Sequence, residues 1–176
     1  MIAVDYLYNG RGEMMGILRA NEEDVDIVAP LIAKFRVELR LFKGIHSTEE
    51  IDSAKQEFIE DINAGYPIYI WKENAACLGY LVCRVDKPVV WVESLYVISN
   101  YRRKGIASAL FEEAERLAAS YGEDTVYNYV HPNNDSIIAF LRQRGYDVLN
   151  LIEIRKQHAG EVISSIISVG GNEFKY

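Results

Sequence analysis

Apolar residues recur at helical spacing in two stretches of the first third of the chain. In the first stretch, Asn21 can cap a helix, and the acidic residues 22–24 suit its first turn because they complement the helix dipole. Pro30 interrupts the pattern and is expected to kink this helix or to restart it. One face of the helix is expected to be buried, and it carries Val25, Val28, Ile32, Phe35 and Leu39.

The second helix is expected to start at a capping box in residues 47–50. The Ser47 hydroxyl can accept a hydrogen bond from the Glu50 N–H, while the Glu50 carboxylate reaches back to the N–H of Ser47. Gly65 followed by Pro67 ends the helix. Its inner face carries Ile51, Ala54, Phe58 and Ile62.

Strand patterns dominate the rest of the chain. We expect strands at 16–19, 68–71, 77–85, 89–98, 125–130 and 148–154, another near Ile166, and helices at 103–121 and 134–144. This order indicates a mixed α/β or α+β fold, with a largely antiparallel twisted sheet flanked by helices. Residues 1–15 are expected to form a loose N-terminal extension and residues 16–176 a single domain, because no repeat or linker interrupts them.

The composition is that of an ordinary globular domain. Of the 176 residues, 49% are apolar and 26% are charged, and no run of 18 apolar residues could span a membrane. The N-terminus has no basic stretch followed by an apolar core, so we expect a cytoplasmic protein. Cys77 and Cys83 would lie roughly 20 Å apart on a straight strand, too far for a disulfide.

The net charge of −7 disfavours a groove for nucleic acid and mildly favours a cationic partner. Much of the negative charge lies in residues 22–26 and 48–61, on expected helix faces. Two interpretations stay open for it, a solvated helix face and a surface that attracts amines.

An unusually basic turn connects the strand at 89–98 to the helix at 103–121. It reads Ser99-Asn100-Tyr101-Arg102-Arg103-Lys104-Gly105, which matches neither a P-loop nor a dinucleotide-binding fingerprint. A helix N-terminus carries unpaired N–H groups and about half a positive charge, so three cations there are unfavourable unless an anion binds. Gly105 lets a bound group approach the backbone. A diphosphate would suit this site, and a solvated basic turn is the alternative.

From about residue 16 to residue 156 the chain resembles the GNAT superfamily of acyl-CoA-dependent N-acetyltransferases. The most specific likeness is Arg102-x-x-Gly105-x-Ala107, which is similar to the family's pyrophosphate loop. Upstream, residues 93–97 (Glu-Ser-Leu-Tyr-Val) resemble the family's fourth strand with its bulge. Downstream, residues 134–146 resemble its fourth helix and the closing Gly-aromatic pair. The resemblance implies a GNAT-like fold and acetyl-CoA as the cofactor.

The resemblance also implies how acetyl-CoA is held. The backbone at Leu95, Tyr96 and Val97 would pair with the pantetheine arm like an added strand. Asn134 would hydrogen-bond the pantetheine, although Asn is also a favoured helix N-cap, and both interpretations stay open. The pyrophosphate would be held by the loop residues Arg102, Arg103, Lys104, Gly105, Ile106, Ala107 and Ser108.

Glu93 is the candidate catalytic residue for an attack by an amine on the thioester. On a regular strand it would share a face with apolar residues, where an unpaired carboxylate is costly. Either a bulge turns it into a cleft, where it serves a substrate cation, or it forms an ion pair with Arg or Lys. A carboxylate pKa near 4.3 and an amine pKa near 10.4 make direct abstraction uphill, so we expect Glu93 to bind the ammonium and to pass its proton through water. The N–H of Leu95 would polarise the thioester carbonyl.

The general acid is missing at the place where the resemblance puts it. Many family members carry a tyrosine seven residues after the asparagine, and Leu141 stands there in this chain. Leucine cannot donate a proton, so water would protonate the thiolate. Tyr127, Tyr129 and Tyr146 are expected to pack rather than to catalyse. No His, Cys or Asp cluster has the spacing of a metal site, so no metal is expected.

The expected function is therefore transfer of acetyl from acetyl-CoA to a primary amine on a small molecule, polyamine or peptide. A non-catalytic acyl-CoA-binding or sensing module is one alternative, and a protein-lysine or N-terminal acetyltransferase is another. The acceptor is left unspecified. The tail at 162–176 could complete the sheet or exchange with another subunit, which leaves a homodimer open.

Overall fold

The computed structural model describes residues 7–8 and 14–176. The chain divides into two units, residues 1–138 and residues 139–176, and each is described by itself. Of the expected extension 1–15, residues 1–6 and 9–13 lie outside the described part. Strand β1 (Leu7–Tyr8) pairs with β2 (Met14–Arg19), so the strand expected at 16 already begins at 14. The single domain expected for 16–176 stays a prediction.

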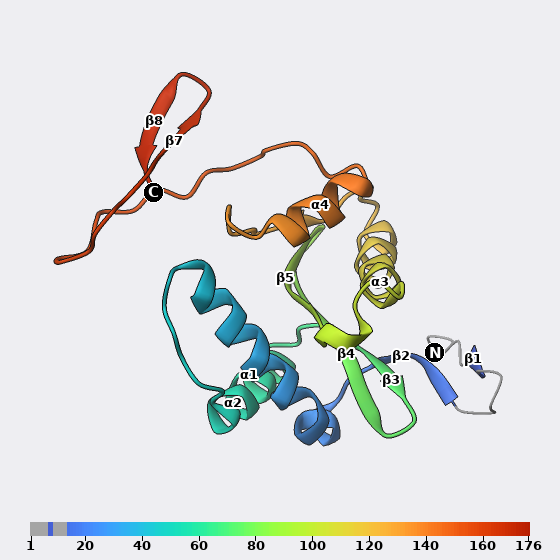
Figure 1. The fold of residues 1–176 in the computed structure, drawn as a ribbon. Coiled ribbons are helices and arrows are strands. Elements are labelled where there is room, and N and C mark those ends of the chain that lie inside the picture. Colours follow the sequence, from blue (N-terminus) through green and yellow to red (C-terminus); the bar gives the residue numbers. More distant parts are fainter. Residues whose placement is uncertain (1–6, 9–13) are drawn as a thin grey trace. The chain divides into compact units, whose positions relative to one another are not determined.

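A six-stranded sheet organises the first unit, in the order β1-β2-β3-β4-β5-β6 (Figure 1). Every neighbouring pair is antiparallel except β5 and β6, which are parallel. The mixed, largely antiparallel sheet predicted from the pattern is confirmed. Beyond β1 and β2, its strands are β3 (Ile68–Glu73), β4 (Ala76–Asp86), β5 (Val89–Val97) and β6 (Tyr127–Asn128).

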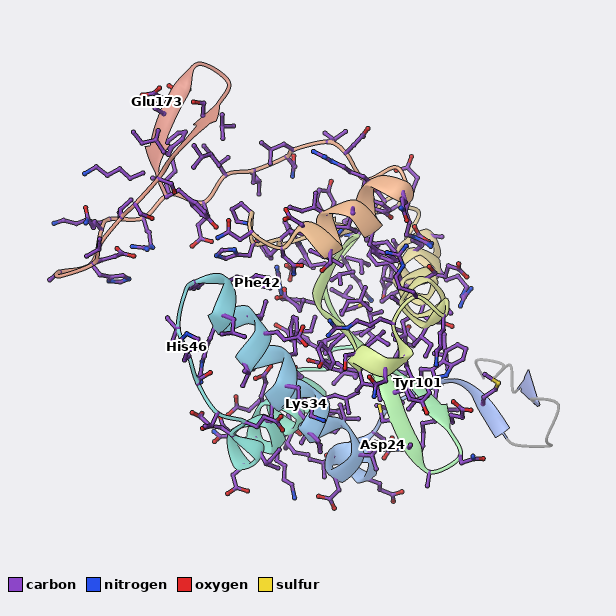
Figure 2. All side chains as sticks on the ribbon, viewed as in Figure 1. Asp24, Lys34, Phe42, His46, Tyr101 and Glu173 are labelled. Carbon is purple, nitrogen blue, oxygen red and sulfur yellow. The ribbon has the colours of Figure 1, made fainter. Side chains whose placement is uncertain are left out.

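One face of this sheet packs against α1 (Val25–Phe42) and α2 (Ile51–Asn63), which lie side by side (Figure 1). Alternation along each strand sends every second side chain to this face. Side chains fill the space between these helices and the sheet (Figure 2). The most deeply buried members of the resulting core are Val28, Ala29, Ile32, Phe58, Ile68, Ile70 and Tyr80.

The opposite face packs against α3 (Ile106–Ser120), whose buried residues include Leu110 and Phe111. Gly79 in β4 allows this approach. A Cβ at Gly79 would lie 2.9 Å from the Tyr96 carbonyl oxygen and 3.2 Å from a methyl group of Ile106, the first residue of α3. The absence of a side chain at Gly79 therefore lets the N-terminus of α3 lie close to β5.

The helix starts differ in part from the sequence predictions. Asn21 does form a capping box, but on the 3₁₀ turn Glu22–Asp24 that precedes α1. The helix α1 neither stops nor restarts at Pro30. Proline so near the N-terminus removes only the bond to the carbonyl of Asp26, the second helical residue.

The capping box predicted at residues 47–50 is wrong. Helix α2 begins at Ile51 without a side-chain cap, and the Ser47 hydroxyl is buried without a hydrogen-bond partner among the described residues. The Glu50 carboxylate lies 3.5 Å from the Arg40 guanidinium of α1 instead of bonding back to Ser47. The predicted end is confirmed, because α2 stops at Asn63 and Gly65 has a φ of +78°.

Helix α4 (Asp135–Gln143) begins in the first unit and ends in the second. The strand predicted at 148–154 is wrong. No strand pairs with this segment in the described chain, and Val148 and Ile154 are 86% and 66% exposed. Its alternating apolar pattern has β propensity but no neighbour to complete a ladder. The strand near Ile166 is present as β7 (Ile166–Val169), in a hairpin with β8 (Asn172–Lys175).

The close approach at Gly79 predicts a large effect of a small substitution. Gly79→Ala should lower the free energy of unfolding by about 1–3 kcal/mol, the usual cost of overpacking, because the backbone oxygen of Tyr96 cannot move aside. Urea denaturation followed by circular dichroism measures this change. Gly171→Ala is the control, since a Cβ there meets nothing within 4 Å. Equal stability of the two variants would contradict the assigned role of Gly79.

Candidate active site

Strand β5 loses its neighbour on one side halfway along its length. It pairs with β6 only through Trp91↔Tyr127 and Val92↔Asn128, and no strand in the described chain continues that pairing over residues 93–97. The backbone of Leu95, Tyr96 and Val97 therefore borders an unpaired edge. An extended ligand could hydrogen-bond there as a further strand would.

The basic turn leads from this edge into α3. After the 3₁₀ turn Ser99–Tyr101, Arg103 and Gly105 adopt positive φ angles of 63° and 86°. The first intrahelical bond runs from Ala109 N–H to the Gly105 carbonyl at 3.0 Å, and no side chain caps the helix. The N–H groups of residues 106–108 precede that bond, so they are available to an anion.

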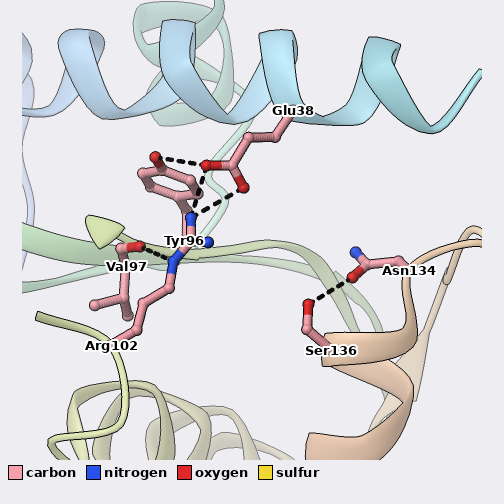
Figure 3. Close-up of polar contacts among 6 residues, drawn as sticks. All are labelled: Glu38, Tyr96, Val97, Arg102, Asn134 and Ser136. Atoms are coloured by element: carbon pink, nitrogen blue, oxygen red, sulfur yellow. Dashed lines mark hydrogen bonds and ion pairs between the residues drawn. The ribbon is translucent and has the colours of Figure 1, made fainter. Parts of the chain in front are cut away.

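Arg102 already has partners within the protein (Figure 3). Its Nε donates to the Val97 carbonyl at 2.8 Å, and its Nη2 donates to both carboxylate oxygens of Glu38 in α1, at 2.7 and 2.9 Å. The Tyr96 hydroxyl donates to Glu38 Oε1 at 3.1 Å, and the Arg102 guanidinium lies 5.2 Å from the Tyr96 ring centre. Three cations without an anionic partner in the protein are expected from the sequence, but Glu38 compensates one of them.

Glu38 was not predicted from the sequence. It lies among other charged residues on α1, and nothing in the local pattern distinguishes it from a solvated side chain. Lys104 also has a protein contact, with Nζ 4.4 Å from the centre of the Tyr101 ring. Arg103 and Lys104 remain exposed at the helix N-terminus.

Asn134 caps α4, so its structural role is present. Its Oδ1 accepts from the Ile137 N–H at 3.3 Å and from the Ser136 hydroxyl at 3.0 Å (Figure 3). These bonds use the oxygen of the amide and leave the Nδ2 group to donate elsewhere. The N-cap role is therefore compatible with a ligand role.

Glu93 is the extra residue of a β-bulge. Ser94 pairs with Val82 and Val92 pairs with Cys83, so Glu93 has no partner in β4. Val82 and Cys83 point to opposite faces of the sheet, and the bulge reverses the alternation of β5 accordingly.

The bulge changes which residues share a face with Glu93. Glu93 and Ser94 both line a cavity on the side of α1 and α2. Leu95 and Val97, which a regular strand would place beside Glu93, pair with Leu81 and Gly79 on the α3 side. The bulge expected from the sequence is present.

Glu93 also forms the ion pair that was its alternative explanation. Its Oε1 accepts from Arg84 Nε at 2.7 Å, and 32% of its side chain is exposed. Arg84 also pairs with Asp86 and lies 5.3 Å from the Trp91 ring centre. One oxygen of Glu93 is therefore held by a positioned guanidinium, and among the described residues no partner bonds the other oxygen.

A cavity of about 230 Å³ adjoins Glu93. Charged residues from both helices and two strands dominate its lining. In α1 and α2, Arg36 Nε donates to Glu57 at 2.9 Å, and a second nitrogen of the same guanidinium completes a bidentate pair. The full lining is Arg36, Glu57, Asp61, Tyr66, Arg84, Glu93 and Ser94.

Asp61 differs from the other charged residues of the cavity. Burial, together with the charge of Glu57, raises the pKa of Asp61 to about 6, against the opposing effect of Arg36. The charge of Glu93 contributes in the same direction as that of Glu57. Within residues 14–176, the Asp61 carboxylate forms no ion pair or side-chain hydrogen bond. The cleft at Glu93 was one of the expectations from the sequence, but Asp61 was not predicted, because α2 carries several acids of similar spacing.

The remaining sequence candidates have structural roles. Tyr127 and Tyr129 both contact Trp91, with ring centres 5.0 and 4.6 Å away, so the expected packing role is confirmed for them. Leu141 is 6% exposed. Cys77 and Cys83 are buried free thiols, and burial raises the pKa of each to about 12.

The described residues contain neither a candidate metal site nor a candidate membrane span. No group of three or more His, Cys, Asp or Glu side chains in that part of the chain could hold a metal ion. None of the helices formed by residues 14–176 is both long and apolar enough to cross a membrane.

The sequence between residues 33 and 146 matches the acetyltransferase (GNAT) family. This stretch is more than half of the chain and contains the bulge, the basic turn and Asn134. The protein belongs to the GNAT family of acetyltransferases, as its motifs predicted. Acetyl-CoA is the acetyl donor that this family implies.

Individual relatives are distant in sequence. The chain is 26% identical over 101 residues to Probable N-acetyltransferase san of Drosophila melanogaster, an alignment that covers 54% of this chain and 55% of that protein. The chain therefore spans about half the length of this curated relative.

Solved structures support the fold. The aminoglycoside antibiotic 6'-N-acetyltransferase AAC(6')-IG from Acinetobacter haemolyticus superposes with a TM-score of 0.62 at 18% identity, covering 81% of this chain and 98% of the other. The PaiA N-acetyltransferase from Thermoplasma acidophilum, in complex with coenzyme A, gives 0.63 at 19% identity, covering 74% and 87%. At such identities these likenesses concern the fold, and the predicted GNAT-like fold is confirmed.

The raised pKa of Asp61 predicts a pH dependence of stability. Between about pH 4 and pH 6 the folded protein retains a proton on Asp61 that the unfolded chain has lost, so this residue's contribution to stability falls as the pH rises through that window. Asp61→Asn should remove that decline and be relatively more stable than the wild type above pH 6. Urea denaturation from pH 4 to pH 7.5 measures the difference. Asp52→Asn, at an exposed position of α2, should follow the wild type, and a parallel profile for Asp61→Asn would refute the assignment.

Proposed function

We propose that this protein transfers the acetyl group of acetyl-CoA to a primary amine bound in the cavity beside Glu93. One observation carries the proposal. The bulge at Glu93 turns a carboxylate into a cavity at the point where β5 loses its pairing with β6. A ligand pairing with the free edge of β5 would bring its reactive end next to an amine in that cavity.

Acetyl-CoA would be held by three groups of contacts. The pantetheine arm would pair with the backbone of Leu95, Tyr96 and Val97, and the Asn134 amide would donate to it. The pyrophosphate would bind at the basic turn and the first turn of α3. The backbone N–H groups that would hold the pyrophosphate come from Gly105, Ile106, Ala107 and Ser108. The cations beside it would be Arg102, Arg103 and Lys104.

Arg102 has to change partners in this scheme. Its bond to Val97 occupies a carbonyl oxygen that the pantetheine would use. Its bonds to Glu38 occupy the guanidinium that the pyrophosphate would use. A phosphate is a strong competitor for a guanidinium, because the new bonds are also charge-assisted. Binding would therefore exchange one ion pair for another and leave Glu38 to its bond with Tyr96.

Glu93 would bind the incoming ammonium through the oxygen that Arg84 does not hold. The ammonium loses a proton through water, because a carboxylate is far too weak a base to remove it directly. The neutral nitrogen attacks the thioester carbon, whose oxygen is polarised by the Leu95 N–H. The carbon–sulfur bond then breaks with the electron pair leaving on sulfur, and the nitrogen gives up a second proton to water, which leaves the neutral amide.

The leaving thiolate would take its proton from solvent. Leu141 cannot supply one, and Tyr127 and Tyr129 are engaged in packing against Trp91. A thiol pKa near 8.5 makes the thiolate a tolerable leaving group, so the absence of a protein acid is compatible with turnover.

The size of the cavity favours a small amine or a single extended side chain as acceptor. At about 30 Å³ per water in the liquid, 230 Å³ holds roughly seven waters. The structural neighbour AAC(6')-IG acts on an aminoglycoside antibiotic according to its name, and the related chemistry for this chain is acetylation of an amino group. A non-catalytic acyl-CoA sensor would have no use for a carboxylate in this position.

Two glycines with nearly the same positive φ angle allow a test of the cofactor site. Gly105→Ala should weaken CoA binding about tenfold or more, because a Cβ at φ 86° forces the turn to shift and displaces the N–H groups of residues 106–108. Isothermal titration calorimetry with CoA measures the affinity. Gly122→Ala, at φ 85° beyond the other end of α3, is the control and should cost similar stability without changing CoA affinity. CoA binding unaffected by either change would place the cofactor elsewhere.

Glu93→Gln tests the catalytic assignment. With acetyl-CoA and a panel of amines, free thiol release should fall about a hundredfold or more, and its dependence on pH should steepen. Asp86→Asn is the matched control, because it removes the other carboxylate bound to Arg84 and lies outside the cavity. An unchanged rate for Glu93→Gln across pH would disprove the assignment. CoA binding without turnover of any amine by the wild type would favour the sensor instead.

A further inference from the structure

We propose that Asp61 binds a second ammonium group of the acceptor, so that the cavity selects short diamines and polyamines over monoamines of equal length. This inference rests on the proposed function, because it assigns the first amino group to Glu93. It adds a residue of α2 that determines specificity without taking part in the chemical step.

The ion pairs formed by the other charged residues of the cavity indicate which charge a ligand should carry. Arg36 forms a bidentate pair with Glu57, and Arg84 is shared between Glu93 and Asp86. Both guanidinium groups therefore already have anionic partners. Asp61 is the one charged lining residue without an ion pair among the described residues. The unsatisfied charge in the cavity is negative, which favours a cation and disfavours an acceptor carboxylate.

The cavity places Asp61 and Glu93 in one compartment. Both line it, one from the last turn of α2 and the other from the bulge of β5. The charge of Glu93 is near enough to help raise the pKa of Asp61. An acceptor with two ammonium groups on a short flexible chain can therefore meet both carboxylates at once, whereas a monoamine satisfies only one.

The buried Tyr80 hydroxyl lies near the same charged residues, although Tyr80 itself does not line the cavity. Tyr80 is 1% exposed, and its hydroxyl completes no hydrogen bond of ordinary geometry within the described residues. Buried hydroxyls normally have a partner. The groups near enough to influence the Tyr80 phenol are all cavity residues, namely Arg36, Glu57, Asp61 and Ser94.

The test compares 1,4-diaminobutane with n-butylamine as acceptors. Wild-type protein should acetylate the diamine with a kcat/KM about ten- to a hundredfold higher, the range expected for one charge-assisted contact. Asp61→Asn should lose that preference through a higher KM for the diamine, with the monoamine changed less than about twofold. Asp52→Asn, an exposed aspartate in the same helix, should keep it. Equal losses for both amines in Asp61→Asn would overturn the proposal, because they would indicate a structural role.

A binding measurement separates this inference from the proposed function. If no amine of the panel, including these two, is acetylated, the proposed function fails. Calorimetry with 1,4-diaminobutane in the presence of CoA then still tests Asp61. Binding that is tenfold weaker in Asp61→Asn supports the second-ammonium site, and binding that is absent or equal in both proteins overturns it.

The ratio of the two kcat/KM values should also depend on pH. Asp61 is faced by Glu57 and Glu60 from α2, Arg36 from α1, Arg84 and Glu93 from the sheet, and Tyr66 beyond α2. Because the pKa of Asp61 is raised to about 6, the preference for the diamine should decline below that pH as the carboxylate is neutralised. Taking the ratio largely cancels the pH dependence of the chemical step, which the two acceptors share. A pH-independent ratio in the wild type would contradict a role for the Asp61 charge.

Discussion

Glu93, the residue of β5 that has no partner in β4, determines how the candidate site is arranged. A regular strand would continue its alternation through Glu93 and place it beside Leu95 and Val97, towards α3. The bulge reverses the alternation, so Glu93 and Ser94 both face the cavity, whereas Leu95 and Val97 face α3 and Tyr96 faces α1 and α2. The same strand also loses its β6 neighbour after Val92. One irregularity thus sets an acceptor cavity beside an edge that suits an extended cofactor.

The cationic side chains at the two ends of the candidate site are paired in different ways. At the cofactor end, Arg102 is held by Glu38 and the Val97 carbonyl, which compensates its charge until an anion replaces them. At the acceptor end, the guanidinium groups are fully engaged, and the excess is carboxylate. In the proposed function, an anionic cofactor and a cationic acceptor would therefore meet at β5 from regions of opposite electrostatic preference. This separation also limits competition between the two ligands for the same groups.

The agreement between sequence and structure follows the range of the interactions involved. Strands β3, β4 and β5 and helix α3 were predicted within a few residues, because each has strong periodicity bounded by turn residues. The capping box at Ser47 failed because Glu50 lies by Arg40 on a neighbouring helix, a contact that no local pattern reveals. The strand at 148–154 failed because β structure requires a partner strand as well as propensity.

The sequence alone determined the family and, apart from the strand at 148–154, the order of the main elements, and it predicted an anion-binding turn and a role for Glu93. Each depends on short-range spacing, such as Gly105 following Arg102 or an acidic residue in an otherwise apolar strand. Only the tertiary structure decided that Arg102 is paired with Glu38, that Arg84 holds one oxygen of Glu93, and that Asp61 has no ion pair among the described residues. The Arg84–Glu93 pair joins neighbouring strands across 9 positions of the chain, and the Arg102–Glu38 pair joins the basic turn to α1 across 64 positions. Ion pairing at such separations depends on how the elements pack, and no local sequence pattern reveals it.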